Sequence, residues 1–225
     1  MILVAVDTAT PSTVAGVLRA DGTVVEARDD PPAGSRGDHA ARLLPLLEGA
    51  LADAALGWDD VERIAVGVGP GGFTGLRIGI ATARALAQAR GLPLVPVSSL
   101  AALAAGAVAD GGDELIAAVL DARRGEVFAG VWAGGRTLLE PAALAPDALA
   151  DRLSGLEQPV QAVGDGAVRF RQELEGAGVA VPVDGSAAHR IAAAPLCRLG
   201  AVGEPAERDR LLPDYRREPD AKPPQ

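Results

Sequence analysis

The sequence is poor in cysteine, histidine and aromatic residues. Of its 225 residues, one is cysteine, two are histidine and only 3% are aromatic. The single cysteine, Cys197, cannot form an internal disulfide, and we expect it to be buried as a small apolar side chain. A nucleophile pair of Cys197 and His189 is disfavoured, because the two would lie eight residues apart on one helix. Since 48% of the residues are hydrophobic, the core must consist mainly of Ala, Val, Leu and Ile.

The sequence also lacks the excess of basic residues that free nucleic-acid binding requires. Its formal net charge is -9, whereas binding to a phosphate backbone depends on cationic contacts. Any contact with RNA is therefore expected to run through a partner. We find no signal-peptide pattern and no apolar run of transmembrane length, so we expect a soluble, cytoplasmic protein that does not bind membranes. Residues 63–109 contain no acidic residue, although the chain as a whole is acidic.

The stretch from Val66 to Gly91 carries the strongest local signals. A β-branched strand ends in the turn Gly69-Pro70-Gly71-Gly72, and a helix is predicted from Phe73 to residue 90, with Gly91 as its stop. Inside this helix, small residues recur every four positions, at Gly75, Gly79 and Ala83. An interior glycine costs roughly 1 kcal/mol relative to alanine. We therefore expect this face to pack closely against a backbone or another helix.

The glycine turn fits two nucleotide-binding patterns incompletely. Gly67-x-Gly69-x-x-Gly72 matches the dinucleotide motif, but the acidic residue expected about 20 residues later is missing. A P-loop needs a lysine on the phosphates, and the nearest equivalent here is Arg77 at the wrong spacing. A dinucleotide-dependent oxidoreductase is therefore disfavoured, and a tight turn that lets a helix pack is the preferred interpretation.

The chain contains an internal repeat. Residues 7–26 align without a gap on residues 121–140, and Asp7 and Asp121 are among six identical pairs. Later strands also match at a shorter offset, 65–69 on 162–166 and 95–97 on 181–183. The order strand, strand, strand, helix, strand, helix, strand, helix thus occurs twice. This duplication predicts an α/β protein of two lobes, each with a mixed sheet flanked by helices.

The remaining elements of the first repeat follow from turn and cap residues. Asp38 is a suitable N-cap for a helix from His39 to Leu56, which Pro45 is expected to kink. Asp21-Gly22 is a hairpin signal. The other expected elements are strands at 2–6, 13–19, 23–27 and 94–97 and a helix from 98 or 99 to 108. Residues 211–225 are broken up by prolines, and their end is expected to be mobile.

Six short motifs follow one another along nearly the whole chain. The most specific is G-P-G-x-F-T-G-L-R at residues 69–77, and the others lie at residues 2–10, 38–45, 97–100, 121–123 and 213–217. Together they resemble the bacterial TsaB (YeaZ) family of tRNA threonylcarbamoyladenosine biosynthesis proteins. The resemblance implies the sugar kinase/Hsp70/actin fold, with two RNase-H-like lobes, in agreement with the repeat. The expected lobes are residues 1–98, joined by 211–225, and residues 99–210.

The resemblance implies a role other than catalysis by this chain. TsaB-like proteins pair with their catalytic paralogue TsaD, which transfers a threonylcarbamoyl group from its adenylate to N6 of adenosine 37 in tRNA, and they work with the ATPase TsaE. The pairing uses the helices expected at 39–56 and 73–90, and a homodimer is expected when the partner is absent. The expected interface is an exposed apolar patch on both helices: Leu43, Leu46, Leu47, Ala50, Gly75, Arg77, Gly79 and Ala83. Arg77 either lies at the rim of that contact or holds the Gly69 turn.

The same resemblance bears on metal and nucleotide binding. Catalytic relatives hold a metal through His-x-x-x-His on the first helix; here His39 is present, but the partner position is Leu43. One imidazole cannot hold a catalytic metal, so neither a metal site nor a metallopeptidase is expected.

ATP-binding members of the fold bind phosphates with the hairpin after the first strand of each lobe. Those positions correspond here to Asp7, Thr8, Asp121 and Arg123. Bulky Arg123 and Arg124 stand where close approach needs glycine, so two interpretations stay open. Either some ATP or ADP binding persists, or each aspartate caps its own turn. No other cofactor is expected, and the rival function is a stand-alone ATP-dependent kinase or ATPase of the same fold.

Overall fold

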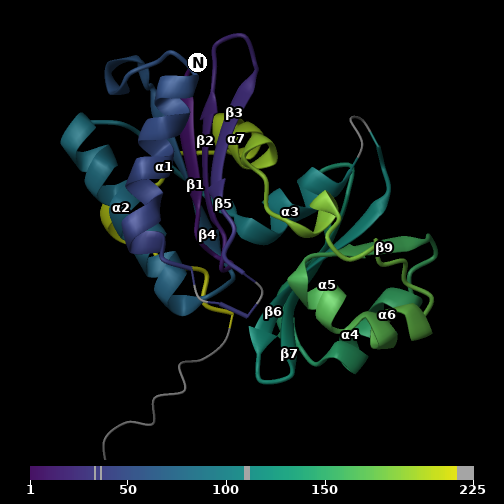
Figure 1. Cartoon of the computed structure of the whole chain (residues 1–225). Helices are drawn as coiled ribbons and strands as arrows, with labels where there is room; N and C mark the ends of the chain where they lie inside the picture. Colours follow the sequence, from purple (N-terminus) through teal and green to yellow (C-terminus); the bar gives the residue numbers. More distant parts are fainter. Residues whose placement is uncertain (33, 36, 109–111, 217–225) are drawn as a thin grey trace, which may run out of the picture.

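The computed structural model describes residues 1–32, 34–35, 37–108 and 112–216, which form two mixed sheets with helices packed on them (Figure 1). The first sheet has the order β3-β2-β1-β4-β5. Its strands are β1 (Leu3–Asp7), β2 (Thr13–Leu18), β3 (Val24–Asp29), β4 (Arg63–Gly69) and β5 (Leu94–Ser98). β1, β2 and β3 pair antiparallel, and β4 and β5 extend the sheet in parallel from β1.

The second sheet repeats this arrangement. Its order is β8-β7-β6-β9, from β6 (Leu115–Arg123), β7 (Glu126–Ala133), β8 (Arg136–Leu144) and β9 (Val160–Val163). β6 takes the central place of β1, with an antiparallel neighbour on one side and a parallel one on the other. The predicted duplication and the predicted α/β fold are therefore confirmed.

The second sheet lacks the fifth strand that the repeat predicted at residues 181–183. Only an isolated bridge forms there, between Gln161 and Ala180. The reason lies in the hydrogen bonds of the following residues. The carbonyl groups of Val181 and Pro182 accept from the Arg171 guanidinium, at 2.8 and 2.6 Å, and a proline has no N–H for a ladder.

Seven α-helices connect and cover the sheets within the described ranges. They are α1 (His39–Asp53), α2 (Phe73–Arg90), α3 (Ser99–Ala107), α4 (Pro146–Ser154), α5 (Asp165–Arg169), α6 (Arg171–Gly176) and α7 (Ala193–Val202). Short 3-10 turns η1 (Trp58–Asp60), η2 (Ala187–His189) and η3 (Arg208–Arg210) join them. Figure 1 shows α1 and α2 together on one side of the first sheet.

Strand alternation divides the interior into three layers. In β1, Leu3 and Ala5 face a central core, whereas Val4 and Val6 face α1 and α2. β6 divides in the same way between the central core and an outer core under α4, α5 and α6. The central core also contains residues of α3 and α7 and so joins the two sheets. Both faces of each central strand are therefore buried.

The last helix of the second repeat does not stay with its own sheet. α7 packs against β1, β2 and β3 of the first sheet, although residues 99–210 were expected to form the second lobe. Gly16 explains the close approach, because a Cβ there would lie 3.2 Å from Cys197 Sγ and overlap Ala193. The strands of the first sheet lie within residues 3–98 and those of the second within residues 115–163, whereas α7 packs on the first sheet.

The first helix begins at His39 as predicted, but its capping and its C-terminal end differ from the prediction. Asp38 stands at the N-cap position, but its side chain makes no capping hydrogen bond. The helix ends at Asp53 rather than Leu56, because Ala55 turns left-handed with φ 54° and the Leu56 N–H bonds back to Leu51 O. This is a Schellman-type ending, here formed without glycine.

The helix predicted from Phe73 to residue 90 matches its prediction. α2 spans Phe73–Arg90 and ends at Gly91 with φ 66°, where the left-handed backbone favours glycine. In the described part of the C-terminal segment, Leu211 is 4% exposed and lies within the core under α1 and α2. The predicted mobile end, residues 217–225, lies outside the described residues.

Candidate functional site

The carboxylate of Asp7 lies at the end of β1, where it joins three segments of the chain. Its Oδ1 accepts from Ala9 N at 2.8 Å, and its Oδ2 accepts from Ser99 Oγ at 2.6 Å. Ser99 Oγ in turn accepts from Gly69 N at 3.2 Å. Asp7 is 1% exposed, and burial raises the pKa of its carboxyl group. This carboxylate therefore ties β1, the glycine turn and the start of α3 together.

The glycine turn packs against the same loop through its backbone. A Cβ on Gly67 would overlap the Asp7 carboxylate, and one on Gly71 would overlap Ala9 O. Gly72 N donates to Ala9 O at 2.7 Å. The glycines thus let the chain's own β1–β2 loop approach, which confirms the interpretation of a tight turn that lets a helix pack.

Thr8 fills the small-residue face of α2. Its hydroxyl donates to Gly75 O at 2.8 Å, and it is 1% exposed. A Cβ on Gly75 would overlap Thr8 O, and one on Gly79 would overlap Thr8 Oγ1. The glycine face of α2 was expected to meet a partner, but it is occupied by the β1–β2 loop of the same chain.

His39 packs beside this loop. Its Nδ1 lies 2.8 Å from Thr13 Oγ1, and the residue is 7% exposed. Burial lowers the pKa of the imidazole, against smaller raising contributions from Asp29 and Asp38. Leu43, one helical turn on, is 1% exposed within the apolar core. His39 therefore has a side-chain partner within this chain, and the position one turn further along the helix is an apolar core residue.

The second lobe repeats the turn geometry with more exposed residues. Asp121 Oδ1 accepts from Arg123 N at 2.9 Å, as Asp7 accepts from Ala9 N. Asp121 Oδ2 also meets Arg169 Nη1 at 2.7 Å and Arg123 Nη1 at 3.3 Å. Asp165 Oδ1 accepts from Asp121 N at 3.0 Å, and burial raises the pKa of Asp165. Each repeat aspartate thus caps its own turn, as one of the two open interpretations predicted.

Cys197 and His189 are separate in the structure. Cys197 is fully buried on α7, and burial raises the pKa of its thiol to about 12. His189 ends η2, where its Nδ1 accepts from Gly164 N at 3.1 Å and its Nε2 faces Pro182 O at 3.0 Å. The expectation that both stand on one helix is wrong, because residues 190–192 separate η2 from α7.

The predicted exposed patch on α1 and α2 is largely wrong. Six of its eight residues are buried in the chain's own core: Leu43, Leu47, Ala50, Gly75, Gly79 and Ala83. Leu46 is half-buried, and Arg77 is exposed. The leucine periodicity was assigned to the wrong side of the helices, because the apolar side of an amphipathic helix that covers a sheet faces that sheet.

The exposed start of α2 carries a cluster that the sequence prediction did not assemble. The Arg77 guanidinium carbon lies 3.8 Å from the centroid of the Phe73 ring, and its Nε donates to Tyr215 OH at 3.1 Å. The Phe73 and Tyr215 ring centroids are 5.6 Å apart. Phe73 and Tyr215 are 50% and 45% exposed. Both belong to motifs quoted for the family, but the motifs lie about 140 residues apart in the sequence, so only the fold shows that they meet.

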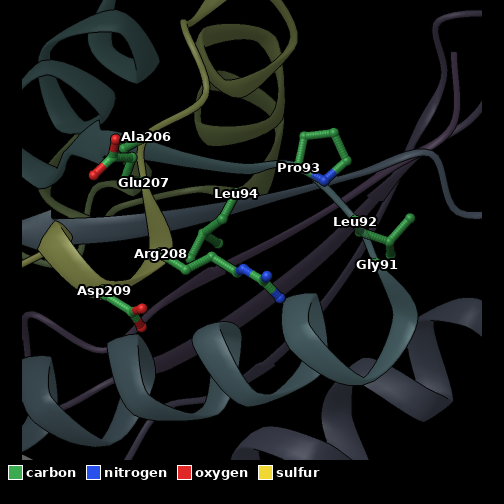
Figure 2. Close-up of a pocket in the computed structure, with 8 residues that line it drawn as sticks. All are labelled: Gly91, Leu92, Pro93, Leu94, Ala206, Glu207, Arg208 and Asp209. Carbon is green, nitrogen blue, oxygen red and sulfur yellow. The ribbon is translucent and has the colours of Figure 1, made fainter.

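A cavity in the described structure lies elsewhere (Figure 2). It has a volume of about 500 Å³ and is lined by Gly91, Leu92, Pro93, Leu94, Ala206, Glu207, Arg208 and Asp209. Figure 2 shows Arg208 extending past Leu94. None of the predicted site residues lines this cavity.

Two broad tests on the described residues give no further site. No group of three or more His, Cys, Asp or Glu side chains is placed to hold a metal ion in the part of the chain that the structure describes. No helix of the described ranges has the length and apolar character needed to cross a membrane.

Comparison with known proteins identifies close relatives. The family model described as TsaD, tRNA N6-adenosine threonylcarbamoyltransferase, matches residues 31–194. The tRNA threonylcarbamoyladenosine biosynthesis protein TsaB of Bacillus subtilis is 33% identical over 225 residues, covering 96% of this chain and 94% of its own. YeaZ from Pseudomonas aeruginosa superposes with a TM-score of 0.79 at 30% identity, over 95% of this chain and 99% of that one.

A more distant likeness concerns the fold alone. The ROK hexokinase from Thermus thermophilus superposes with a TM-score of 0.51 at 17% identity, over 87% of this chain and 97% of that one. This relationship confirms the sugar kinase type of fold that the family resemblance implied.

Proposed function

This chain belongs to the TsaB (YeaZ) family of tRNA threonylcarbamoyladenosine biosynthesis proteins, and we propose that it is the non-catalytic, activating subunit of the assembly that makes this modification. In this proposal the catalytic step is performed by a TsaD-like paralogue, with a TsaE-like ATPase as the third component. tRNA reaches this chain only through that complex. The chain alone forms a homodimer through the surface that otherwise pairs with the paralogue.

The observation that carries the proposal is that the β1–β2 loop of the first lobe is filled by contacts within the chain. A phosphate-binding hairpin must offer free backbone N–H groups and open space. Here Ala9 N donates to Asp7, Gly72 N donates to Ala9 O, and the Thr8 hydroxyl donates into α2. A nucleotide could enter only if these buried contacts were broken. Their loss would leave buried polar groups unpaired, at about 1–3 kcal/mol each.

The partner surface is placed on the outer sides of α1 and α2. The residues there are mostly small or apolar, and they include Ala41, Leu44 and Pro45 of α1 and Phe73, Ile78, Ala81 and Ala85 of α2. Small side chains let two helices approach closely, and exposed apolar patches mark interfaces. Leu46 and Arg77 stay in the proposed surface, whereas the six buried residues support it from beneath.

The proposal is tested by titrating the chain first with magnesium-ATP and then with the TsaD-like paralogue of the same organism, in a calorimeter. We expect no ATP binding and clear binding of the paralogue. Ala81→Arg on the outer side of α2 should abolish the pairing while the thermal unfolding midpoint stays unchanged. Ala148→Arg, an exposed alanine on α4, is the matched control and should bind as the wild type.

The rival is a stand-alone ATP-dependent kinase or ATPase of the same fold. Tight magnesium-ATP binding with turnover, and no binding of the paralogue, would establish the rival and refute the proposal. Asp7 and Asp121 would then be the residues to substitute. Ala83 is unsuitable for mapping the interface, because it is fully buried and an arginine there would disrupt the core.

A further inference from the structure

Arg77 differs from the other arginines of α2 in what its side chain contacts. Arg84 pairs with Asp209 at 3.1 Å, and Arg90 pairs with Asp59 at 3.0 Å. Arg77 uses only its Nε, which donates to Tyr215 OH. Among the residues that the structure describes, its two terminal amino groups have no hydrogen-bond or ion-pair partner, and the residue is exposed.

The guanidinium is held in one orientation although it is exposed. Its central carbon lies over the Phe73 ring, 3.8 Å from the centroid, and its Nε donates to the Tyr215 hydroxyl. Stacking on an aromatic face and a directed hydrogen bond both restrict the side chain. The paired edge of the guanidinium faces Tyr215, and its two terminal nitrogens are left to meet a ligand.

The Tyr215 side of the cluster is anchored to the first lobe. Asp214 N donates to Val68 O at 2.8 Å, and Leu211 is buried beneath α1 and α2. Phe73 is fixed as the first residue of α2. The C-terminal segment therefore builds the cluster, by returning to the helix that begins about 140 residues earlier.

The charge around Arg77 favours an anionic ligand. No acidic residue occurs between residues 63 and 109, so α2 supplies no acid of its own. Asp214, next to Tyr215 in the sequence, is paired with Arg216 at 2.7 Å. A planar guanidinium with two free nitrogens matches a carboxylate in a bidentate pair.

We propose that Arg77, oriented by Phe73 and Tyr215, is a preorganised anchor for a carboxylate side chain on the partner subunit. This inference rests on the proposed function and names the chemistry of the contact. A protein carboxylate fits better than an RNA phosphate, because the flanking surface is aromatic and the chain carries a net charge of -9. Aromatic residues and arginine are also the types enriched in interface hot spots.

The test measures the affinity of the full-length chain for the TsaD-like paralogue by calorimetry. Arg77→Lys keeps the charge but loses the planar pair and the stacking, and we expect it to weaken binding roughly tenfold or more. Tyr215→Phe keeps the ring but frees Nε, and should weaken binding by about threefold to tenfold. Arg84→Lys is the matched control on the same helix and should bind like the wild type, because its charge is already paired.

The partner's carboxylate is identified by a double-mutant cycle. Surface Asp→Asn and Glu→Gln variants of the paralogue are titrated with the wild type and with Arg77→Lys. One of them should weaken wild-type binding by a similar factor and show no further loss with Arg77→Lys. Thermal unfolding of each variant checks that the fold is retained.

Each other outcome overturns the inference. Equal binding of Arg77→Lys and wild type would show that the guanidinium is not an anchor. Loss of the Arg77→Lys effect after removal of residues 217–225, which include Glu218 and Asp220, would assign the ligand to this chain itself. An effect on tRNA retention without an effect on subunit affinity would assign it to RNA. If the wild-type chain did not bind the paralogue at all, the proposed function would fail first.

Discussion

Gly79 tests whether the small-residue face of α2 is made for the chain's own loop. In the structure this face meets Thr8, and a Cβ on Gly79 would overlap Thr8 Oγ1 while lying 3.5 Å from Thr8 Cβ. The same hydroxyl donates to Gly75 O at 2.8 Å. Gly79→Ala should therefore displace the threonine hydroxyl and break a buried hydrogen bond.

The expected magnitude follows from three contributions to the free energy of unfolding. Overpacking a rigid site costs about 1–3 kcal/mol, and loss of the buried hydrogen bond costs about 1 kcal/mol. The change from glycine to alanine within a helix returns about 1 kcal/mol. The net loss is about 1–3 kcal/mol, which lowers the unfolding midpoint by roughly 2–12 °C in a chain of this size.

The assay is thermal unfolding followed by circular dichroism, with Gly49→Ala on α1 as the control. Gly49 is exposed, and a Cβ there would meet nothing within 4 Å. Only the gain in helix propensity remains, so this variant should raise the midpoint by roughly 2–4 °C. The double variant Thr8→Ala/Gly79→Ala removes the overlapping hydroxyl, and it should be more stable than the sum of the single effects by about 1–3 kcal/mol.

A stabilised Gly79→Ala protein would refute this reasoning. It would mean that the face has free space, as an open partner surface would. Additive behaviour of the two substitutions would likewise show that Thr8 and Gly79 do not compete for the same volume.

Three further outcomes follow from buried groups. Burial raises the folded-state pKa of Asp7 above its ordinary value of 3.8, so the stability that Asp7 contributes is present below pH 3.8 and declines as pH rises through the raised pKa. In Asp7→Asn, the unfolding midpoint should therefore depend less on pH above 3.8. An unchanged pH dependence would contradict the assignment. Cys197, with a pKa of about 12, should react with a disulfide reagent at pH 8 only when urea unfolds the chain, and fast labelling of the native protein would exclude its burial. Glu26 Oε2 accepts from Ala193 N at the start of α7, at 2.6 Å. Glu26→Ala should therefore lower the free energy of unfolding by about 1–2 kcal/mol and speed amide hydrogen exchange at the start of α7. Exchange protection equal to that of the wild type would rule out this capping contact.

The fold class could be predicted from the sequence because it depends on local patterns and on a repeat. Hairpin signals and the glycine stop after α2 depend on near neighbours in the chain. The correspondence of Asp7 with Asp121 follows from aligning the two repeats. Both aspartates cap their turns, because a carboxylate two residues before an N–H reaches it in almost any such turn. These features were confirmed.

Which side of each helix faces inward could not be predicted from the sequence. α2 is apolar or small over most of its surface, so its periodicity allows either the leucine side or the glycine side to face out. In the structure the glycine side of α2 faces inward, where the buried Thr8 hydroxyl donates to Gly75 O. This hydrogen bond forms only when the glycines face the sheet. The predicted interface residues were therefore assigned to the wrong side of the helix.

Tertiary structure alone also brought distant segments together. The sequence by itself determined the two-lobe repeat, the turns and the succession of elements in the first lobe, since each rests on contacts within one short stretch or on direct comparison of two stretches. It did not determine that α7 crosses to the first sheet, that Ser99 closes on Asp7, or that Tyr215 orients Arg77. Those contacts join residues about 90 or more positions apart, and their geometry depends on how all the layers pack.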